Sequence, residues 1–76
     1  MDIKDFIQNF ADLFDDTDAS LITTETKFRE LEEWSSLAAL NVLMMIDEEY
    51  GVELPADEMR KTNTIKELFD MVQSKL

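Results

Sequence analysis

The stretch SSLAALNVLMMIDEEYG, residues 35–51, decides the fold of this chain. Apolar residues recur along it at helical spacings, and the glycine that follows Tyr50 is a common helix terminator. The stretch therefore predicts a helix that begins near Ser35 or Ser36 and runs to Tyr50. The broad apolar surface of this helix comprises Leu37, Leu40, Leu43, Met44 and Ile46.

Two more helices are predicted towards the ends of the chain. Apolar residues fall at helical spacings from Asp2 to Phe14, and Asp2 and Asp5 place negative charge where the helix dipole favours it. The segment Thr64-Ile65-Lys66-Glu67 has the spacing of a capping box, so a last helix begins at Thr64. We expect a core formed by Phe6, Phe10, Leu43, Ile46, Ile65, Leu68 and Phe69.

The segments between these helices carry no long apolar period. Residues 15–26 are rich in Asp, Ser and Thr and predict a long loop, which Leu21 and Ile22 are expected to hold against the core. Further along, Phe28, Leu31 and Trp34 are three apart and predict either a short helical turn or a cover over one end of the bundle. For Trp34 we favour the cover, because a tryptophan buries a large area and tolerates a wet edge.

The composition supports an all-helical fold. The chain of 76 residues has no cysteine and a single glycine and proline, which leaves little material for the tight turns of a sheet. Pro55 opens a short segment, residues 56–61, with room for hardly more than one helical turn. We therefore predict one domain over residues 1–76, an all-α four-helix bundle with a long loop between helices one and two and a short third helix.

The charge indicates the kind of partner. Eighteen acidic residues against seven basic ones give a net charge of −11, which repels nucleic acid and anionic membranes and attracts proteins with basic faces. The amino-terminal sequence has no signal-peptide pattern, and no apolar run approaches the roughly 20 residues that span a bilayer. We expect a cytoplasmic monomer.

Most catalytic and metal sites are excluded by residue type. Without histidine or cysteine the chain cannot form Ser-His-Asp or Cys-His nucleophilic sites, nor zinc sites with those ligands. Asp16, Asp18 and Ser20 match the first ligands of a calcium loop, but Leu21 and Lys27 stand where its glycine and terminal glutamate belong. We therefore expect neither an enzyme nor a metal protein.

Several segments together resemble the acyl carrier protein family in order and spacing over nearly the whole chain. These segments are Phe28-Arg29-Glu30-Leu31, Ser35-Ser36-Leu37, residues 46–55 and residues 61–65. The resemblance implies that Ser36, the serine of the family's Asp-Ser-Leu motif, receives a 4'-phosphopantetheine arm from coenzyme A. A phosphopantetheinyl transferase, assisted by magnesium, would attach it. Acyl groups would then travel as thioesters on the arm in fatty-acid, polyketide or related biosynthesis.

Two features depart from the family pattern. Ser35 stands where the family has Asp, and Glu32-Glu33-Trp34 replaces a turn that contains glycine. Two adjacent serines are therefore candidates, and we favour Ser36 because Leu37 follows it directly. A phosphodiester there would meet the unpaired N–H groups and the positive dipole of a helix start. Taken alone, a serine at this position is more often a helix cap than a modified residue, and it is the surrounding register that favours modification of Ser36.

The resemblance also implies that the helix after Ser36 recognises partner enzymes. Its first half is uncharged, and acid returns only at Asp47, Glu48 and Glu49, which favours partners with a small basic patch and more apolar contact. Of the consecutive Leu43, Met44 and Met45, one must face outwards, and we expect Met45, or Met44 if the helix is rotated. The predicted docking residues are Leu37, Leu40, Asn41, Met44, Met45, Asp47 and Glu48.

Three functions remain open on the sequence alone. The first is an acyl carrier for a specialised pathway, whose partners would be the transferase and acyl-transferring or synthase enzymes. The second is a peptidyl or aminoacyl carrier, which differs only in cargo. The third is an unmodified acidic helical module that binds a protein with a basic face.

Overall fold

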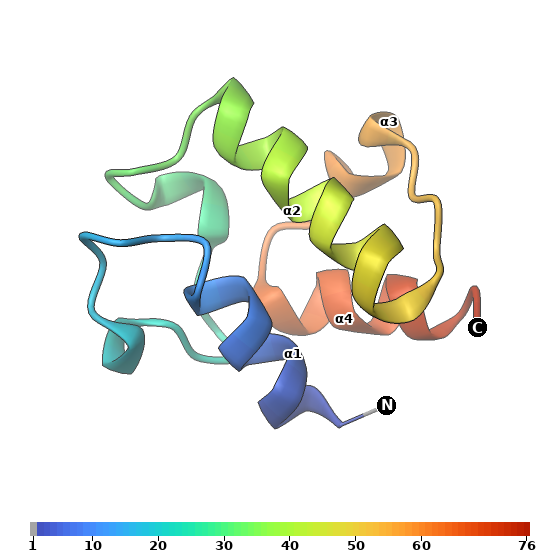
Figure 1. Ribbon diagram of the computed structural model, residues 1–76, viewed down its shortest axis with the longest axis horizontal. Helices are drawn as coiled ribbons and strands as arrows, with labels where there is room; N and C mark the ends of the chain where they lie inside the picture. The colour runs from blue at the N-terminus through green and yellow to red at the C-terminus, as the bar shows by residue number, and fades with distance from the viewer. Residues whose placement is uncertain (1) are drawn as a thin grey trace.

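The computed structural model describes residues 2–76 and contains four α-helices in that range. They are α1 (Ile3–Ala11), α2 (Ser36–Tyr50), α3 (Ala56–Met59) and α4 (Ile65–Gln73), with short 3-10 helices at Ala19–Leu21 and Phe28–Glu30. Figure 1 shows α2 running obliquely across the molecule, with α1 and α4 on one side of it and α3 near its other side. The all-α fold with four helices and a short third helix is confirmed.

The helix boundaries follow from local capping. Asp2 caps α1 by accepting a hydrogen bond from the Lys4 N–H. That helix ends at Ala11 and not at Phe14 as predicted. The N–H groups of Leu13 and Phe14 donate to carbonyl groups three residues back, as in a 3-10 turn, and not four residues back as in an α-helix. At the end of α2, Gly51 has a φ of 68°, the left-handed conformation that glycine adopts without strain. The glycine after Tyr50 therefore ends α2 as the sequence predicts.

The core lies where α1, α2 and α4 meet. Its fully buried large side chains are Phe6, Phe10, Phe28, Val42, Ile46, Ile65, Leu68 and Val72. Phe6 meets Phe69 edge to face with ring centroids 5.6 Å apart, and such pairs add to the free energy of burial. The predicted core is confirmed except for Leu43, which is only partly buried because it borders the surface groove described below.

Trp34 covers one end of this core. Its ring stacks on Phe10 with centroids 6.5 Å apart and lies 5.2 Å from Phe28, while its outer edge stays partly exposed. The Phe28–Glu30 3-10 helix ends four residues before Trp34. Both alternatives drawn from residues 28–34, a short helical turn and a cover over the bundle end, are therefore present together.

The long connection between α1 and α2 is tied to α4 by its backbone. The N–H groups of Ile65 and Lys66 donate to the carbonyl groups of Thr26 and Thr24, at 3.1 and 3.0 Å. Ile22 is buried as predicted, but the prediction for Leu21 is wrong, since its side chain is 63% exposed. Leu21 ends a 3-10 helix and Ile22 is extended, so the two side chains point in different directions.

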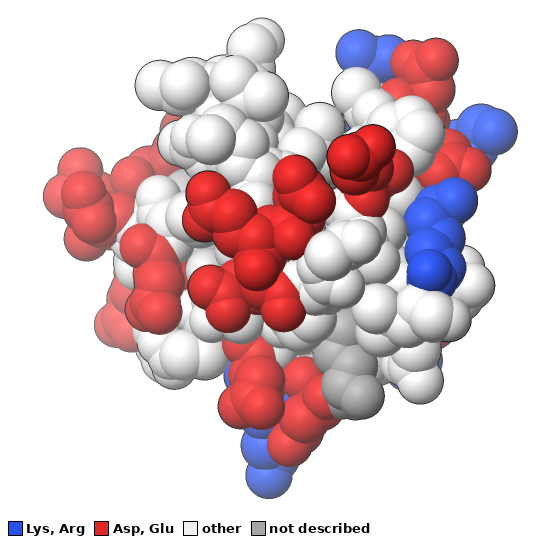
Figure 2. Space-filling view, turned by 45° about the vertical axis from the view of Figure 1, so that its right-hand side comes forward, with Lys and Arg blue, Asp and Glu red and all other residues white. Residues whose placement is uncertain are grey.

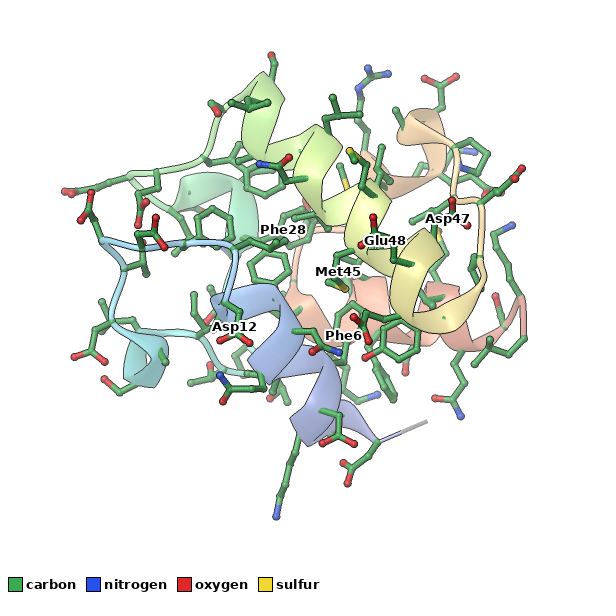
Figure 3. The ribbon with its side chains drawn as sticks, in the orientation of Figure 1. Phe6, Asp12, Phe28, Met45, Asp47 and Glu48 are labelled. Carbon is green, nitrogen blue, oxygen red and sulfur yellow. The ribbon has the colours of Figure 1, made fainter. Side chains whose placement is uncertain are left out.

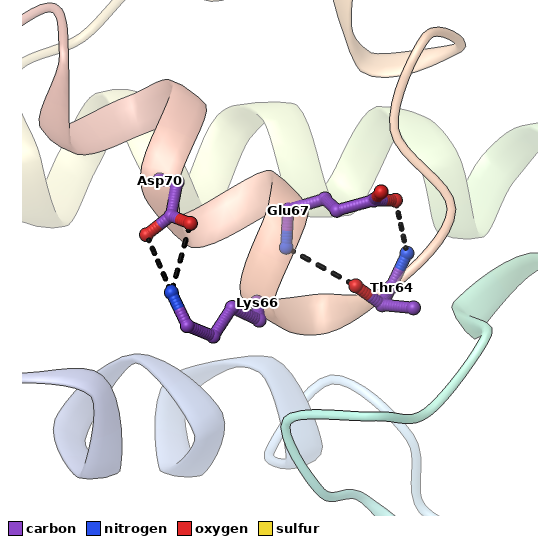
Figure 4. Close-up of polar contacts among 4 residues, drawn as sticks. All are labelled: Thr64, Lys66, Glu67 and Asp70. Carbon is purple, nitrogen blue, oxygen red and sulfur yellow. Dashed lines mark hydrogen bonds and ion pairs between the residues drawn. The ribbon is translucent and has the colours of Figure 1, made fainter.

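Glu67 and Thr64 form the predicted capping box at the start of α4. The Thr64 hydroxyl accepts from the Glu67 N–H, and the Glu67 carboxylate accepts from the Thr64 N–H, at 3.2 and 3.1 Å (Figure 4). The Glu67 carboxylate also accepts from the Asn63 N–H at 2.7 Å. These two backbone hydrogen bonds hold the pKa of Glu67 below its ordinary value of 4.5.

We predict that this lowered pKa makes the capping box sensitive to pH. The pKa of Glu67 is lower in the folded protein than in the unfolded chain. The Glu67 carboxylate therefore contributes its full stabilisation of the fold above pH 4.5, and this contribution is lost as the pH falls through the pKa of Glu67 in the folded protein. Glu67→Gln should therefore lower the melting temperature at neutral pH, and this difference should vanish in acid. Glu53→Gln, which changes an exposed carboxylate, controls for the general effect of removing a negative charge. An equal loss for Glu67→Gln at both pH values would contradict the prediction.

Candidate functional site

The two adjacent serines have different structural roles. Ser35 precedes α2 as its N-cap, and its hydroxyl accepts a hydrogen bond of 3.1 Å from the Ala38 N–H. Ser36 is the first residue of the helix and is exposed. Within residues 2–76 no group forms a hydrogen bond with the Ser36 hydroxyl. The alternative that Ser36 is the helix cap is therefore wrong, since Ser35 has that role and the Ser36 hydroxyl stays free.

The helix start beside Ser36 lacks an acidic residue. The first turns of the other three α-helices contain at least one, namely Asp5, Asp57 with Glu58, and Glu67, whereas the first turn of α2 has none. The N–H groups of Ser36 and Leu37 have no intrahelical acceptor at these positions. Negative charge attached to the Ser36 hydroxyl would therefore meet the positive end of the α2 dipole without a competing carboxylate.

An open groove of about 700 Å³ lies beside Ser36, between α2 and α3. Its apolar walls include Ala39 and Leu43 from α2 and Met59 from α3, and Trp34 lies at its border with the core. Arg29 and Arg60 also line it. Sequence reasoning did not predict that the two arginines share a groove, because they lie 31 positions apart in the chain and no local pattern brings them together.

The exposed face of α2 carries an apolar stripe. Leu37, Leu40 and Met44 are 66%, 52% and 50% exposed and lie at positions i, i+3 and i+7, so they share one side of the helix. Leu43 and Met44 also line a second, smaller groove of about 370 Å³ that reaches Pro55. Leu40 lines the larger groove and Met44 the smaller one, so the stripe starts next to Ser36 and borders both grooves.

One predicted docking residue is misplaced. Met45 is 7% exposed and packs into the core with Val42 and Ile46, so the prediction that Met45 faces outwards is wrong. Figure 3 shows its side chain pointing into the interior between α2 and the other helices. The helix is rotated so that Met44 takes the exposed position, the alternative that the sequence left open.

The remaining predicted docking residues lie further along α2. Asp47 and Glu48 are exposed near its end, and Asn41 is half-buried. Figure 2 shows acidic side chains gathered over one face of the molecule, with the basic ones mainly towards its edges. Within residues 2–76 no cluster of potential metal ligands is present, and no helix is long and apolar enough to cross a membrane.

Comparison with known proteins adds to this geometry. Residues 4–72 match a protein-family model described as the phosphopantetheine attachment site. The chain is 33% identical over 75 residues to an acyl carrier protein of Rubrobacter xylanophilus, covering 95% of this chain and 93% of that protein. An acyl carrier protein of Rickettsia canadensis is 33% identical, and the match covers 76% of this chain and 67% of that protein. An acyl carrier protein of Thermosynechococcus vestitus is 30% identical, and the match covers 78% of this chain and 73% of that protein. No solved structure gives a significant match.

We predict that the two serines differ in their effect on stability. Ser35→Ala removes the cap of α2 and should destabilise the fold by ~1 kcal/mol, which lowers the melting temperature by roughly 4–8 °C in a domain of this size. Ser36→Ala should change stability by less than about 0.5 kcal/mol, because it removes no hydrogen bond. Thermal unfolding of both variants by circular dichroism measures this, and equal losses would contradict the assignment of the cap to Ser35.

Proposed function

This chain belongs to the acyl carrier protein family, and from that premise we propose that its 4'-phosphopantetheine arm is attached through the hydroxyl of Ser36. The observation that carries the proposal is the division of roles between the serines, since Ser35 uses its hydroxyl to cap α2 and Ser36 does not. A family member of this kind is a carrier and not an enzyme. Its function is to present bound groups to the enzymes that act on them.

The residues around Ser36 fit the group. The Ser36 hydroxyl is exposed, the first turn of α2 has no carboxylate to repel a phosphodiester, and two free backbone N–H groups lie at the helix start. When bound, the arm supplies a terminal thiol that holds acyl groups as thioesters, a chemistry that this cysteine-free chain cannot provide itself. The apolar groove beside Ser36 gives the arm and its cargo a surface to lie against.

A phosphopantetheinyl transferase is the partner that this attachment requires. The reaction forms a bond between the Ser36 oxygen and the phosphorus of coenzyme A that bears the pantetheine, and it breaks the pyrophosphate bond. Adenosine 3',5'-bisphosphate leaves, the serine proton passes to a base of the transferase, and magnesium assists. Ser35 is the poorer acceptor, because its modification would break the hydrogen bond to Ala38 that starts α2. The need for coenzyme A is why we propose a cytoplasmic location.

The exposed stripe of α2 is the surface that we propose for partner enzymes. Leu37, Leu40 and Met44 would contact an apolar patch, and Asp47 and Glu48 would meet a smaller basic patch. The first half of α2 is uncharged. Apolar contact would therefore provide more of the binding affinity, and the charges at the end of α2 would act mainly on the association rate. This surface supports a carrier of acyl intermediates in a specialised branch of fatty-acid, polyketide or related biosynthesis.

The other two functions have less support. A peptidyl or aminoacyl carrier would use the same serine and differ only in cargo, while the relatives compared above are acyl carrier proteins. An unmodified interaction module conflicts with the match of residues 4–72 to a phosphopantetheine attachment site. We propose that residues 1–76 form one carrier domain, which is supported by the cluster of buried side chains that spans the described residues 2–76.

The attachment site is tested by intact mass. The purified apo protein, incubated with coenzyme A, magnesium and a transferase of broad specificity, should gain the mass of one phosphopantetheine group. Ser35→Ala should still gain it and Ser36→Ala should not, because only Ser36 offers the reactive hydroxyl. A gain that persists in Ser36→Ala but is lost in Ser35→Ala would overturn the site. No gain in the unaltered protein with any active transferase would overturn the function.

The docking surface is tested with the same transferase. Met44→Ala should lower kcat/KM for arm transfer by roughly tenfold, because truncation of a central apolar contact costs 1–2 kcal/mol of binding free energy. Leu21→Ala is the matched control, since Leu21 is also an exposed apolar residue but lies in the long connection away from α2. A loss of similar size in the control would show that the effect does not belong to the α2 stripe.

A further inference from the structure

Arg29 is a half-buried cation that forms no salt bridge within residues 2–76. Its Nη2 donates to the Asn63 side-chain oxygen at 2.6 Å, and its Nη1 donates to the Met59 carbonyl oxygen at 3.4 Å. Both acceptors are neutral. The three salt bridges within residues 2–76 join other side chains, namely Arg60 with Asp57, Lys66 with Asp70, and Lys75 with Glu58. The hydrogen bonds therefore orient the guanidinium group but give it no salt bridge among these residues.

The surroundings of Arg29 supply no carboxylate in salt-bridge contact within the described residues. The acidic group that Arg29 influences, Glu67, already accepts hydrogen bonds from the N–H groups of Asn63 and Thr64. The Phe28 ring lies 5.3 Å from the guanidinium carbon and offers only the weaker attraction of a π face. A guanidinium group that is partly removed from water binds carboxylate or phosphate more strongly than one in bulk solvent, because less of its charge is screened.

Arg60 places a second guanidinium group on the same groove. It pairs with Asp57 at 2.6 Å, but both side chains are mostly exposed, so this pair is weak and exchangeable. The chain has only seven Lys and Arg residues against eighteen acidic ones, and two of the seven line the groove beside Ser36. The molecule has a net charge of −11, but this groove is lined by two positive side chains and can therefore accept an anion.

We propose that Arg29, assisted by Arg60, makes this carrier favour cargo that ends in a carboxylate over cargo that ends in a methyl group. The apolar walls formed by Ala39, Leu43 and Met59 would take the body of the chain, and the guanidinium groups its anionic end. The groove volume of about 700 Å³ lies in the range of sites that enclose small organic ligands. This proposal rests on the proposed attachment at Ser36, which brings the cargo to the groove.

Three loaded forms of the protein test the proposal. Intact mass first confirms loading from coenzyme A, from hexanoyl coenzyme A and from adipoyl coenzyme A, the last two having chains of equal length that end in methyl and carboxylate. The adipoyl form should melt roughly 2–6 °C higher than the hexanoyl form at low ionic strength. It should also shift the Arg29 Nε resonance in a nitrogen–proton correlation spectrum. Salt should reduce the melting difference, since it screens the ion pair.

Variants separate the arginines from the overall charge. Arg29→Gln should abolish the difference between the adipoyl and hexanoyl forms, and Arg29→Lys should retain part of it. Lys61→Gln is the matched control, because it removes the same charge from an exposed residue beside Arg60 that does not line the groove. The difference should persist in this control. The comparison of loaded forms in the unaltered protein needs no variant and stands even if Arg29→Gln folds poorly.

Several results would overturn the proposal. Equal melting temperatures and equal Arg29 spectra for the adipoyl and hexanoyl forms would show that the groove does not select a carboxylate. An equal shift of the Arg29 resonance in the form loaded from coenzyme A alone would identify the phosphodiester as the anion. Loss of the difference in Lys61→Gln would assign the effect to net charge. If no form gains an arm, the function proposed for Ser36 fails, and selection of its cargo fails with it.

Discussion

The rotation of α2 about its own axis is the constraint on which the rest of the structure depends. Val42, Met45 and Ile46 point into the core, and their burial leaves Leu37, Leu40 and Met44 on the outside. A chain without disulfides and without cysteine or histidine metal ligands must obtain its stability from packing, so this burial cannot be exchanged for another rotation at low cost. The same rotation places Ser36 in solvent and turns Leu43 towards the groove.

The two serines at the start of α2 have separate roles, because the cap of the helix is the uncharged Ser35. The Ser35 hydroxyl satisfies the Ala38 N–H and starts the helix, which leaves the next hydroxyl without an internal role. An aspartate at the cap would add negative charge beside a phosphodiester attached to Ser36, whereas a serine adds none. The helix start therefore retains its positive end for the group that the family attaches there.

Charge is distributed so that the groove differs from the rest of the surface. The acidic faces would attract basic partner proteins, and the exposed apolar stripe of α2 would supply close contact on the surface that we propose for docking. Arg29 and Arg60 lie beside that stripe, in a pocket that a partner would approach together with the cargo. The proposed docking surface and the proposed cargo site would thus lie next to each other on α2.

By itself the sequence determined much of what depends on neighbouring residues. The start of α2 at the serine pair, its end at Gly51, the capping box of Thr64 and Glu67 and the acidic surface all follow from short-range rules of hydrogen bonding and charge. Most of the core followed too, because α1 and α4 each have one clear apolar face.

Only the tertiary structure decided how these elements face one another. The apolar residues of α2 extend around much of its circumference, so periodicity gives their relative positions but not the rotation that buries Met45 and exposes Met44. Nor could the sequence place Arg29 and Arg60 in one groove, because segments distant in the chain meet only when the whole core packs. The choice of Ser35 as the cap likewise needed the exact start of α2, which neighbouring residues define only to within a residue or two.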